Sequence, residues 1–139
     1  MEKEIESRED LIKEIERALK YVKKGLASAQ KRYRRSRILN VILRPFLGMA
    51  SVLTEKSGYE SALRGFLAAY SILSRLLSEG FFEKFLSLEE RNVLREILER
   101  FQPDDIVIYY REERYDLLME KIEGFCKHLS QLLSNISSS

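Results

Sequence analysis

The sequence predicts an all-α fold, in the form of a single-domain antiparallel helical bundle of about five helices. Only six Gly and two Pro interrupt the 139 residues, and β-branched residues are sparse outside one short run, which favours helices. Hydrophobic residues make up 45% of the chain and charged residues 33%, a balance typical of a globular protein. Several segments also repeat apolar residues at spacings of three and four, as packed helices do. We therefore assign residues 1–139 to one helical domain, with polar flexible tails at about 1–6 and 135–139.

The first helix is expected to begin near Arg8, where Ser7 and Asp10 resemble a capping box with Asp in place of Glu. Its apolar residues follow one heptad seam that consists of Ile12, Ile15, Leu19, Val22, Leu26, Ala29 and Tyr33. Packing within a helical bundle requires a seam of this kind.

The chain changes character where this seam ends. Apolar positions after Arg37 leave the heptad register, so we predict a bend or break between Ser36 and Asn40, followed by a second helix to about Glu55. Pro45 would kink this helix or lie in its first turn. Apolar side chains surround the segment instead of forming one face, which is typical of a buried helix at the centre of a bundle. A subunit interface and an anionic membrane surface are alternatives for the same pattern, and burial is favoured.

Turn and capping signals divide the middle of the chain. Gly58 is suited to a helix C-terminus, so a third helix is expected over residues 59–77. Ser87 and Glu90 form a capping box, which predicts a fourth helix that runs through Phe101.

The last part of the chain contains one ambiguous run. Pro103 ends the fourth helix, and residues 104–110 have the composition of a strand but no partner strand. They are expected to form either an extended link or the first turn of the last helix, with Asp104 and Asp105 as helix-capping acids. The final helix is predicted over residues 115–136.

The charges are strongly segregated along the chain. The formal net charge is +2, yet ten Lys and Arg and no acid lie between Arg17 and Leu53. The remaining residues therefore carry a net −8, the difference between +2 and +10. Exposed helix faces usually alternate Glu with Lys, because each i,i+4 pair contributes a few tenths of a kcal/mol. The first helix lacks this alternation beyond Arg17, which indicates that its acidic partners come from elsewhere.

We expect the basic residues of the first helix to contact the backbone of nucleic acid. The protein would then be a non-catalytic helical binding subunit within a larger nucleoprotein complex. The residues expected to contact nucleic acid are Arg17, Lys20, Lys24, Lys31, Arg34, Arg35 and Arg37, with Tyr21 as a candidate for stacking on bases. The alternative is a protein-protein interaction module, a homo-oligomer or adaptor, whose basic helix meets an acidic protein surface. Pairing with acids of the same chain is a third interpretation, and the choice between DNA and RNA stays open.

Several classes of protein are not expected. Cys126 and His128 are the single residues of their kinds, so the chain cannot form an internal disulfide or a two-His metal site. They would point away from each other on a helix, and no phosphate-binding loop or nucleophile motif is present. The sequence thus predicts no enzyme, no cofactor and no metal, unless another chain completes a site. An acidic N-terminus and the lack of a long uncharged apolar stretch predict a cytoplasmic protein without a membrane partner. The supply of acid mostly as Glu and of base as Arg and Lys, with few Gln, Asn, His and Cys, favours a thermophilic source.

Replacing Arg34 and Arg35 together with Glu should separate binding from stability. We expect the melting temperature to stay within a few degrees, as for most exposed positions, while binding to polyanions is lost because two phosphate contacts become repulsions. Thermal unfolding and oligonucleotide binding of the same preparation measure both effects. Unfolding of the double variant would show instead that these arginines pair with acids of their own bundle.

Overall fold

The fold is a helical bundle, as the sequence predicts. In this computed structural model the backbone is described for residues 5–43 and 48–138, and the side chains for residues 5–30 and 58–138. Helices account for every regular element in these ranges, and strands are absent from them. The helices are α1 (Arg8–Leu43), α2 (Gly48–Ser78), α3 (Phe81–Phe85), α4 (Leu88–Arg100), α5 (Pro103–Arg111) and α6 (Tyr115–Ser138).

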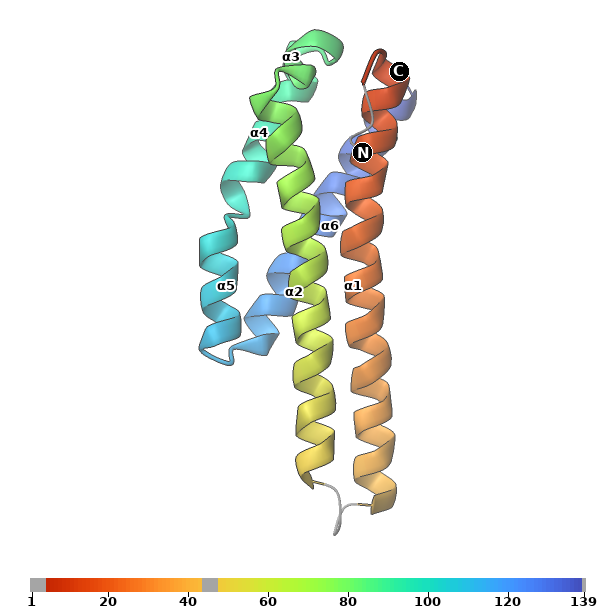
Figure 1. Ribbon diagram of the computed structural model, residues 1–139, viewed down its shortest axis with the longest axis vertical. Helices are drawn as coiled ribbons and strands as arrows, with labels where there is room; N and C mark the ends of the chain where they lie inside the picture. The colour runs from red at the N-terminus through yellow and green to blue at the C-terminus, as the bar shows by residue number, and fades with distance from the viewer. Residues whose placement is uncertain (1–4, 44–47, 139) are drawn as a thin grey trace.

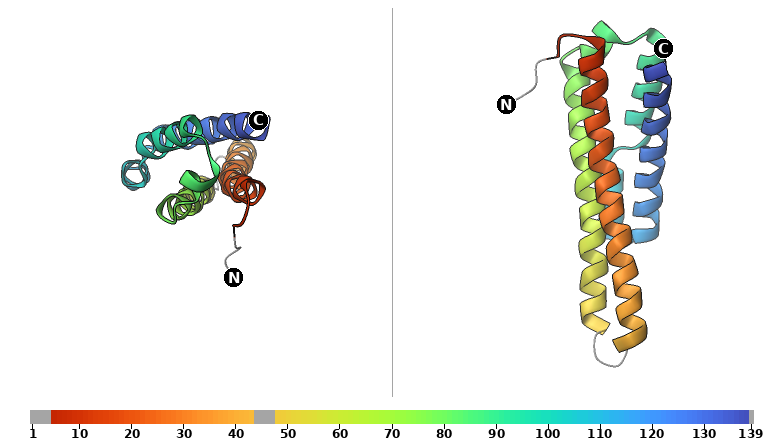
Figure 2. Two further views of the ribbon diagram at one scale, coloured as in Figure 1. Left: turned by 90° about the horizontal axis from the view of Figure 1, so that it is seen from above. Right: turned by 90° about the vertical axis from the view of Figure 1, so that its right-hand side faces the viewer.

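Two long helices form the frame of the molecule. α1 has 36 residues and α2 has 31, so at 1.5 Å per residue each is roughly 50 Å long. They run antiparallel along each other, and the shorter helices lie beside only part of their length (Figure 1). Seen along the long axis, α4, α5 and α6 make a second layer next to the α1–α2 pair (Figure 2). α6 contacts both long helices and therefore closes the core between the layers.

The predicted bend in the first helix is wrong, and so is the predicted turn at Gly58. α1 continues without a break through Ser36 and Asn40 to Leu43, and Gly58 lies buried within α2. The change of apolar register near Ser36 and the glycine at position 58 are weak local signals. The many contacts between the two paired long helices outweigh them, so both segments stay helical. Pro45 lies outside the described residues.

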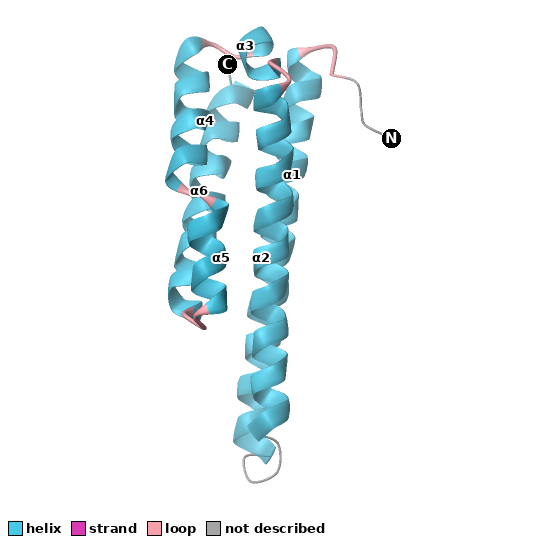
Figure 3. Ribbon diagram, turned by 60° about the vertical axis from the view of Figure 1, so that its left-hand side comes forward, coloured by secondary structure: helices cyan, strands magenta, loops and turns pink. Residues whose placement is uncertain are grey.

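The described parts of the apolar segment after Asn40, residues 41–43 and 48–53, do not lie at the centre of the bundle, which corrects the second expectation for this region. The α1–α2 hairpin extends past the turn between α5 and α6, and the end of α1 lies in this extension (Figure 3). The rings of Tyr59 and Tyr115 stack with their centroids 4.3 Å apart, which places the start of α6 level with Tyr59 of α2. The part of α2 before Tyr59 therefore has α1 as its neighbour and lies beyond α6.

The predicted capping box at Ser87 is confirmed, and the one at Ser7 forms only in part. Ser87 Oγ accepts a hydrogen bond from the backbone N–H of Glu90 at 3.2 Å, and Glu90 accepts one from the backbone N–H of Ser87 at 2.9 Å. This reciprocal capping box begins α4 as expected. At the start of α1, Ser7 Oγ accepts from the Asp10 N–H at 3.2 Å, while the Asp10 carboxylate accepts from the N–H of Glu6 instead of Ser7.

The ambiguous run at 104–110 is helical. It belongs to a helix of its own, α5, with Pro103 at the first position and Asp104 and Asp105 in the first turn. Carboxylates there favour the positive end of the helix dipole, as expected for capping acids. α5 ends in a tight turn at Glu113, whose φ of 60° lies in the left-handed region.

At the two ends of the described residues, Ile5 is buried against the core, and α6 continues to Ser138 with Ile136 buried as well. The single-turn helix α3 was not predicted, since it is held by one buried ring, Phe82, and has no periodic pattern of its own.

The buried face of α1 is wider than the predicted heptad seam. Ile15, Leu19, Val22, Leu26 and Ala29 are buried as expected, and so are Leu11 and Ala18 on the flank of that seam. The additional burial follows from the contacts of α1 with two partners, α2 and α6. Aromatic rings join the layers: Phe66 of α2 meets Phe125 of α6 edge-on, at 4.9 Å between centroids.

Two glycines set the distance between α1 and α2. A Cβ atom added to Gly25 would lie 2.7 Å from the carbonyl oxygen of Ser61, and one added to Gly65 would lie 2.5 Å from that of Tyr21. Both distances are shorter than any real Cβ contact, and the neighbouring atoms are backbone, which cannot move aside. The helices therefore pack backbone against backbone at this crossing.

Gly65→Ala should destabilise the protein by about 2 kcal/mol, because an overpacked contact forces the two helices apart. Chemical denaturation measures the loss. Gly124→Ala is the matched control in α6: its Cβ would lie 3.3 Å from the Phe101 ring, a side chain that can shift, so we expect a small effect. Equal stability of the two variants would contradict the backbone contact at Gly65.

Candidate nucleic-acid interface

The described part of the predicted site lies on one exposed face of α1. Arg17, Lys20, Tyr21 and Lys24 are all exposed, as the heptad numbering predicts. We call Arg17, Lys20 and Lys24 the basic face. Lys31, Arg34, Arg35 and Arg37 belong to α1 by their backbone, but their side chains lie outside the described residues.

Two cations of the basic face have no acidic partner among the side chains that the structure describes. Within the residues whose side chains are described, no ion pair joins Lys20 or Lys24 to a carboxylate. The described ion pairs involve other residues, for example Arg95 of α4 with Glu83 of α3. The ammonium groups of these two lysines are thus hydrated, and they can pair with an anion that approaches the surface.

Arg17 differs from the two lysines because its guanidinium, although exposed, is paired with a buried acid of the bundle. Its guanidinium donates to Glu14 at 3.0 Å, and Arg75 of α2 donates to the same carboxylate oxygen at 3.3 Å. Glu14 is only 3% exposed, so its charge is satisfied by two arginines from different helices. The third sequence interpretation, pairing with acids of the same chain, therefore holds for Arg17.

Sequence reasoning missed the buried role of Glu14. The residue looks like an ordinary surface acid on the first helix, and its partner Arg75 lies 61 positions away. The acid next to the all-basic stretch in the sequence is Glu16, so the sequence carries no signal that singles out Glu14.

Tyr21 lies next to Arg17 on the exposed side of α1. Its side chain is 42% exposed, and the Arg17 guanidinium lies over the ring, 5.8 Å from the centroid. A cation–π contact at an exposed site contributes about 0.5–1 kcal/mol and orients the ring. One face of an oriented tyrosine is then available for stacking.

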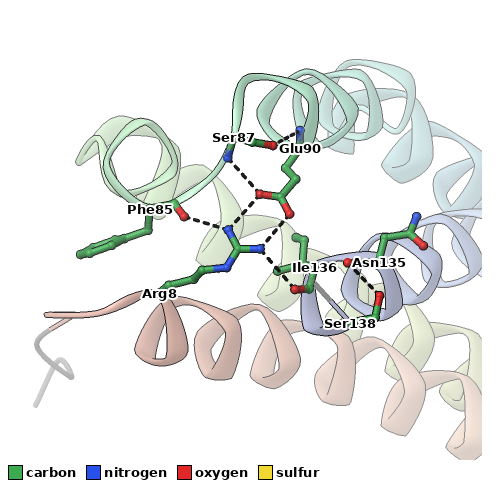
Figure 4. Close-up of polar contacts among 7 residues, drawn as sticks. All are labelled: Arg8, Phe85, Ser87, Glu90, Asn135, Ile136 and Ser138. Atoms are coloured by element: carbon green, nitrogen blue, oxygen red, sulfur yellow. Dashed lines mark hydrogen bonds and ion pairs between the residues drawn. The ribbon is translucent and has the colours of Figure 1, made fainter.

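A second polar cluster joins the ends of four helices and has a structural role. The Arg8 guanidinium makes two hydrogen bonds of 2.9 Å to the carboxylate of Glu90, and it also donates to the carbonyl oxygens of Phe85 and Ile136 (Figure 4). The hydrogen bonds from Arg8, together with one from the Ser87 backbone, lower the pKa of the Glu90 carboxyl to about 2 against the opposing effect of burial. Arg8 thus fastens the start of α1 to α3, α4 and the end of α6.

A groove beside this cluster does not bring together reactive groups. Cavities of about 540 and 260 Å³ lie between α4 and α6 and share Val93, Leu132 and Asn135 as lining residues. Two of the charged groups around them have partners, since Glu90 binds Arg8 and Arg100 lies 3.4 Å from a ring nitrogen of His128. The others, Glu89 and Glu96, are exposed acids. We assign no function to this groove.

Cys126 and His128 do not form a site together. Burial raises the pKa of the half-buried Cys126 thiol, which makes it a poorer nucleophile. His128 contacts Arg100 and the Phe101 ring on the α4 side. Among the described residues, no cluster of three or more His, Cys, Asp or Glu is arranged to hold a metal ion.

Comparisons with family models, curated proteins and solved structures found no match to this chain. Over the part of the chain that the structure describes, none of the helices is long and apolar enough to cross a membrane.

The Arg8–Glu90 pair should make stability depend on acid pH. The pKa of Glu90 is lower in the folded state than its ordinary value of 4.5, so its contribution is complete above about pH 4.5 and is lost as the pH falls towards 2. Glu90→Gln should lower the free energy of unfolding at pH 7 by about 1–2 kcal/mol, a value reduced because Arg8 is partly exposed to water.

Urea denaturation at a series of pH values measures this contribution. The stability difference between the wild type and Glu90→Gln should shrink between pH 4.5 and pH 2. Glu89→Gln, one residue earlier on the exposed side of α4, is the control and should change little. A difference that stays constant with pH would contradict the role of this ion pair.

Proposed function

We propose that this protein is a non-catalytic binding subunit that holds nucleic acid backbone on the exposed side of α1. It would act in the cytoplasm as one component of a larger nucleoprotein complex. The observation that carries the proposal is the pair Lys20 and Lys24, two exposed lysines without an acidic partner among the described residues.

The position of the positive charge supports a long, regularly charged partner. Lys20 and Lys24 are one helical turn apart, and the stretch from Lys31 to Arg37 continues the positive charge along the same helix. A nucleic acid backbone offers phosphates at regular intervals over such a length. The proposed contacts are to phosphate and carry no base information, so we expect little sequence preference.

Lys20→Glu combined with Lys24→Glu should weaken binding of a labelled oligonucleotide and lower the slope of log K against log salt by about two, one for each phosphate contact. The melting temperature should stay within a few degrees because both side chains are exposed. Binding titrations at several salt concentrations measure the slope.

A matched control variant combines Lys84→Glu with Lys127→Glu. Both of these lysines are exposed, on α3 and α6 and therefore away from α1, and the change in net charge is the same. We expect this variant to bind almost like the wild type. Equal losses in the two variants would show that only net charge matters, and the proposed site would be wrong.

The alternative, a protein-protein interaction module, is decided by the same preparations. If the wild type binds no oligonucleotide at low salt while light scattering shows a dimer, the basic face meets protein and not nucleic acid. A monomer that binds nucleic acid with a steep salt dependence supports the proposal.

A further inference from the structure

A surface groove lies between α1 and α2 directly beside Tyr21. It has a volume of about 410 Å³ and is lined by Tyr21, Lys24, Gly25, Ser28, Ser61, Arg64, Gly65 and Ala68. Pockets of this size hold small molecules or single units of a polymer. The groove thus joins two residues of the predicted interface to residues of α2 that the sequence did not connect with it.

The groove has a floor of backbone and small side chains, and its walls carry the larger groups. Gly25 and Gly65 bring the two helices into backbone contact, so no side chain fills the space above the crossing. Tyr21 and Lys24 extend from α1, and Arg64 extends from α2. Hydroxyl groups of Ser28 and Ser61 add polar atoms between the two walls.

The two cations of the groove are accessible to an anion. Lys24 has no ion pair among the described residues, and Arg64 pairs with Glu60 on its own helix at 2.6 Å. The Arg64 side chain is 77% exposed and that of Glu60 is 43% exposed, and an exposed pair of this kind contributes little to stability. A phosphate can therefore take the place of Glu60, or share Arg64 with it, at a small cost in free energy.

The aromatic wall adds a second kind of recognition. Tyr21 is oriented by Arg17 and exposes part of its ring beside the groove. An aromatic ring next to paired cations is the arrangement with which proteins hold single strands, because every base has a flat face that can stack. Bases in a duplex are stacked on one another and do not offer that face.

We infer that this groove binds one nucleotide of a single strand, with its phosphate between Lys24 and Arg64 and its base stacked on Tyr21. This inference rests on the proposed function and deepens it, because it predicts a preference for single strands over duplex. It also assigns binding residues to α2, namely Arg64 and Ser61, whereas the basic face lies on α1 alone.

Fluorescence anisotropy with two labelled probes tests the inference. One is an oligothymidylate of about 30 nucleotides, and the other is a duplex of about 15 base pairs with a similar number of phosphates. We expect the wild type to bind the single strand more tightly. Tyr21→Ala should weaken single-strand binding about tenfold and leave duplex binding unchanged, while Tyr21→Phe should keep both affinities because it keeps the ring.

A charge reversal tests the other wall. Arg64→Glu should weaken single-strand binding, whereas Arg95→Glu should not. Arg95 is a matched control because it is also exposed, at 51%, and pairs with a single glutamate, Glu83. The three side chains to be replaced, Tyr21, Arg64 and Arg95, are exposed, so melting temperatures should confirm that each variant is folded.

The outcomes separate the groove from the wider proposal. If the two probes bind equally and Tyr21→Ala changes neither, the groove inference is overturned while binding on α1 stands. If neither probe binds at low salt, the proposed function fails and the groove inference fails with it. Loss of single-strand binding in Tyr21→Ala and Arg64→Glu, but not in Tyr21→Phe and Arg95→Glu, supports the groove.

Discussion

The contact of α1 with α2 at Gly25 and Gly65 is the constraint on which much of this molecule depends. Because backbone meets backbone there, the register between the two long helices cannot shift without a steric clash. That register brings Glu14 to Arg75 and the face of α1 with Leu11, Ile15 and Ala18 into the core. α6 packs against both helices and completes the burial, and Arg8 fastens the far end of the assembly.

The same contact connects packing with the candidate site. Side chains larger than glycine at the crossing would separate the helices and fill the groove above it. Arg17 also connects the packing of the interior with the candidate site. Its guanidinium pairs with the buried carboxylate of Glu14 and orients the exposed ring of Tyr21. A substitution at Arg17 would therefore affect both the interior and the surface, which makes Lys20 and Lys24 the better positions for a test of binding.

Sequence reasoning succeeds here where a signal is local. The capping box of Ser87 and Glu90 lies within four residues, and the exposure of Lys20 and Tyr21 follows from the period of a single helix. It fails where the answer depends on a distant partner. A helix that changes register near Ser36 looks broken until one sees that a second helix of similar length runs beside it. Glu14 and Arg64 are further examples of this dependence. The partner of Glu14 is Arg75 of another helix, and Arg64 lines a groove that exists only once the two helices are packed together.

The extension of the α1–α2 hairpin past α6 has a consequence for the electric field of the protein. α1 continues for about 20 Å beyond Gln30, and four of the six arginines of α1 lie in that length. At physiological ionic strength, exposed charges are screened over about 8 Å, so the surplus of acids around α4, α5 and α6 cannot cancel the positive charge at the far end. A molecule with a formal charge of only +2 thus behaves as a strong dipole. An approaching polyanion would be turned towards the hairpin and away from the acidic end before any contact forms.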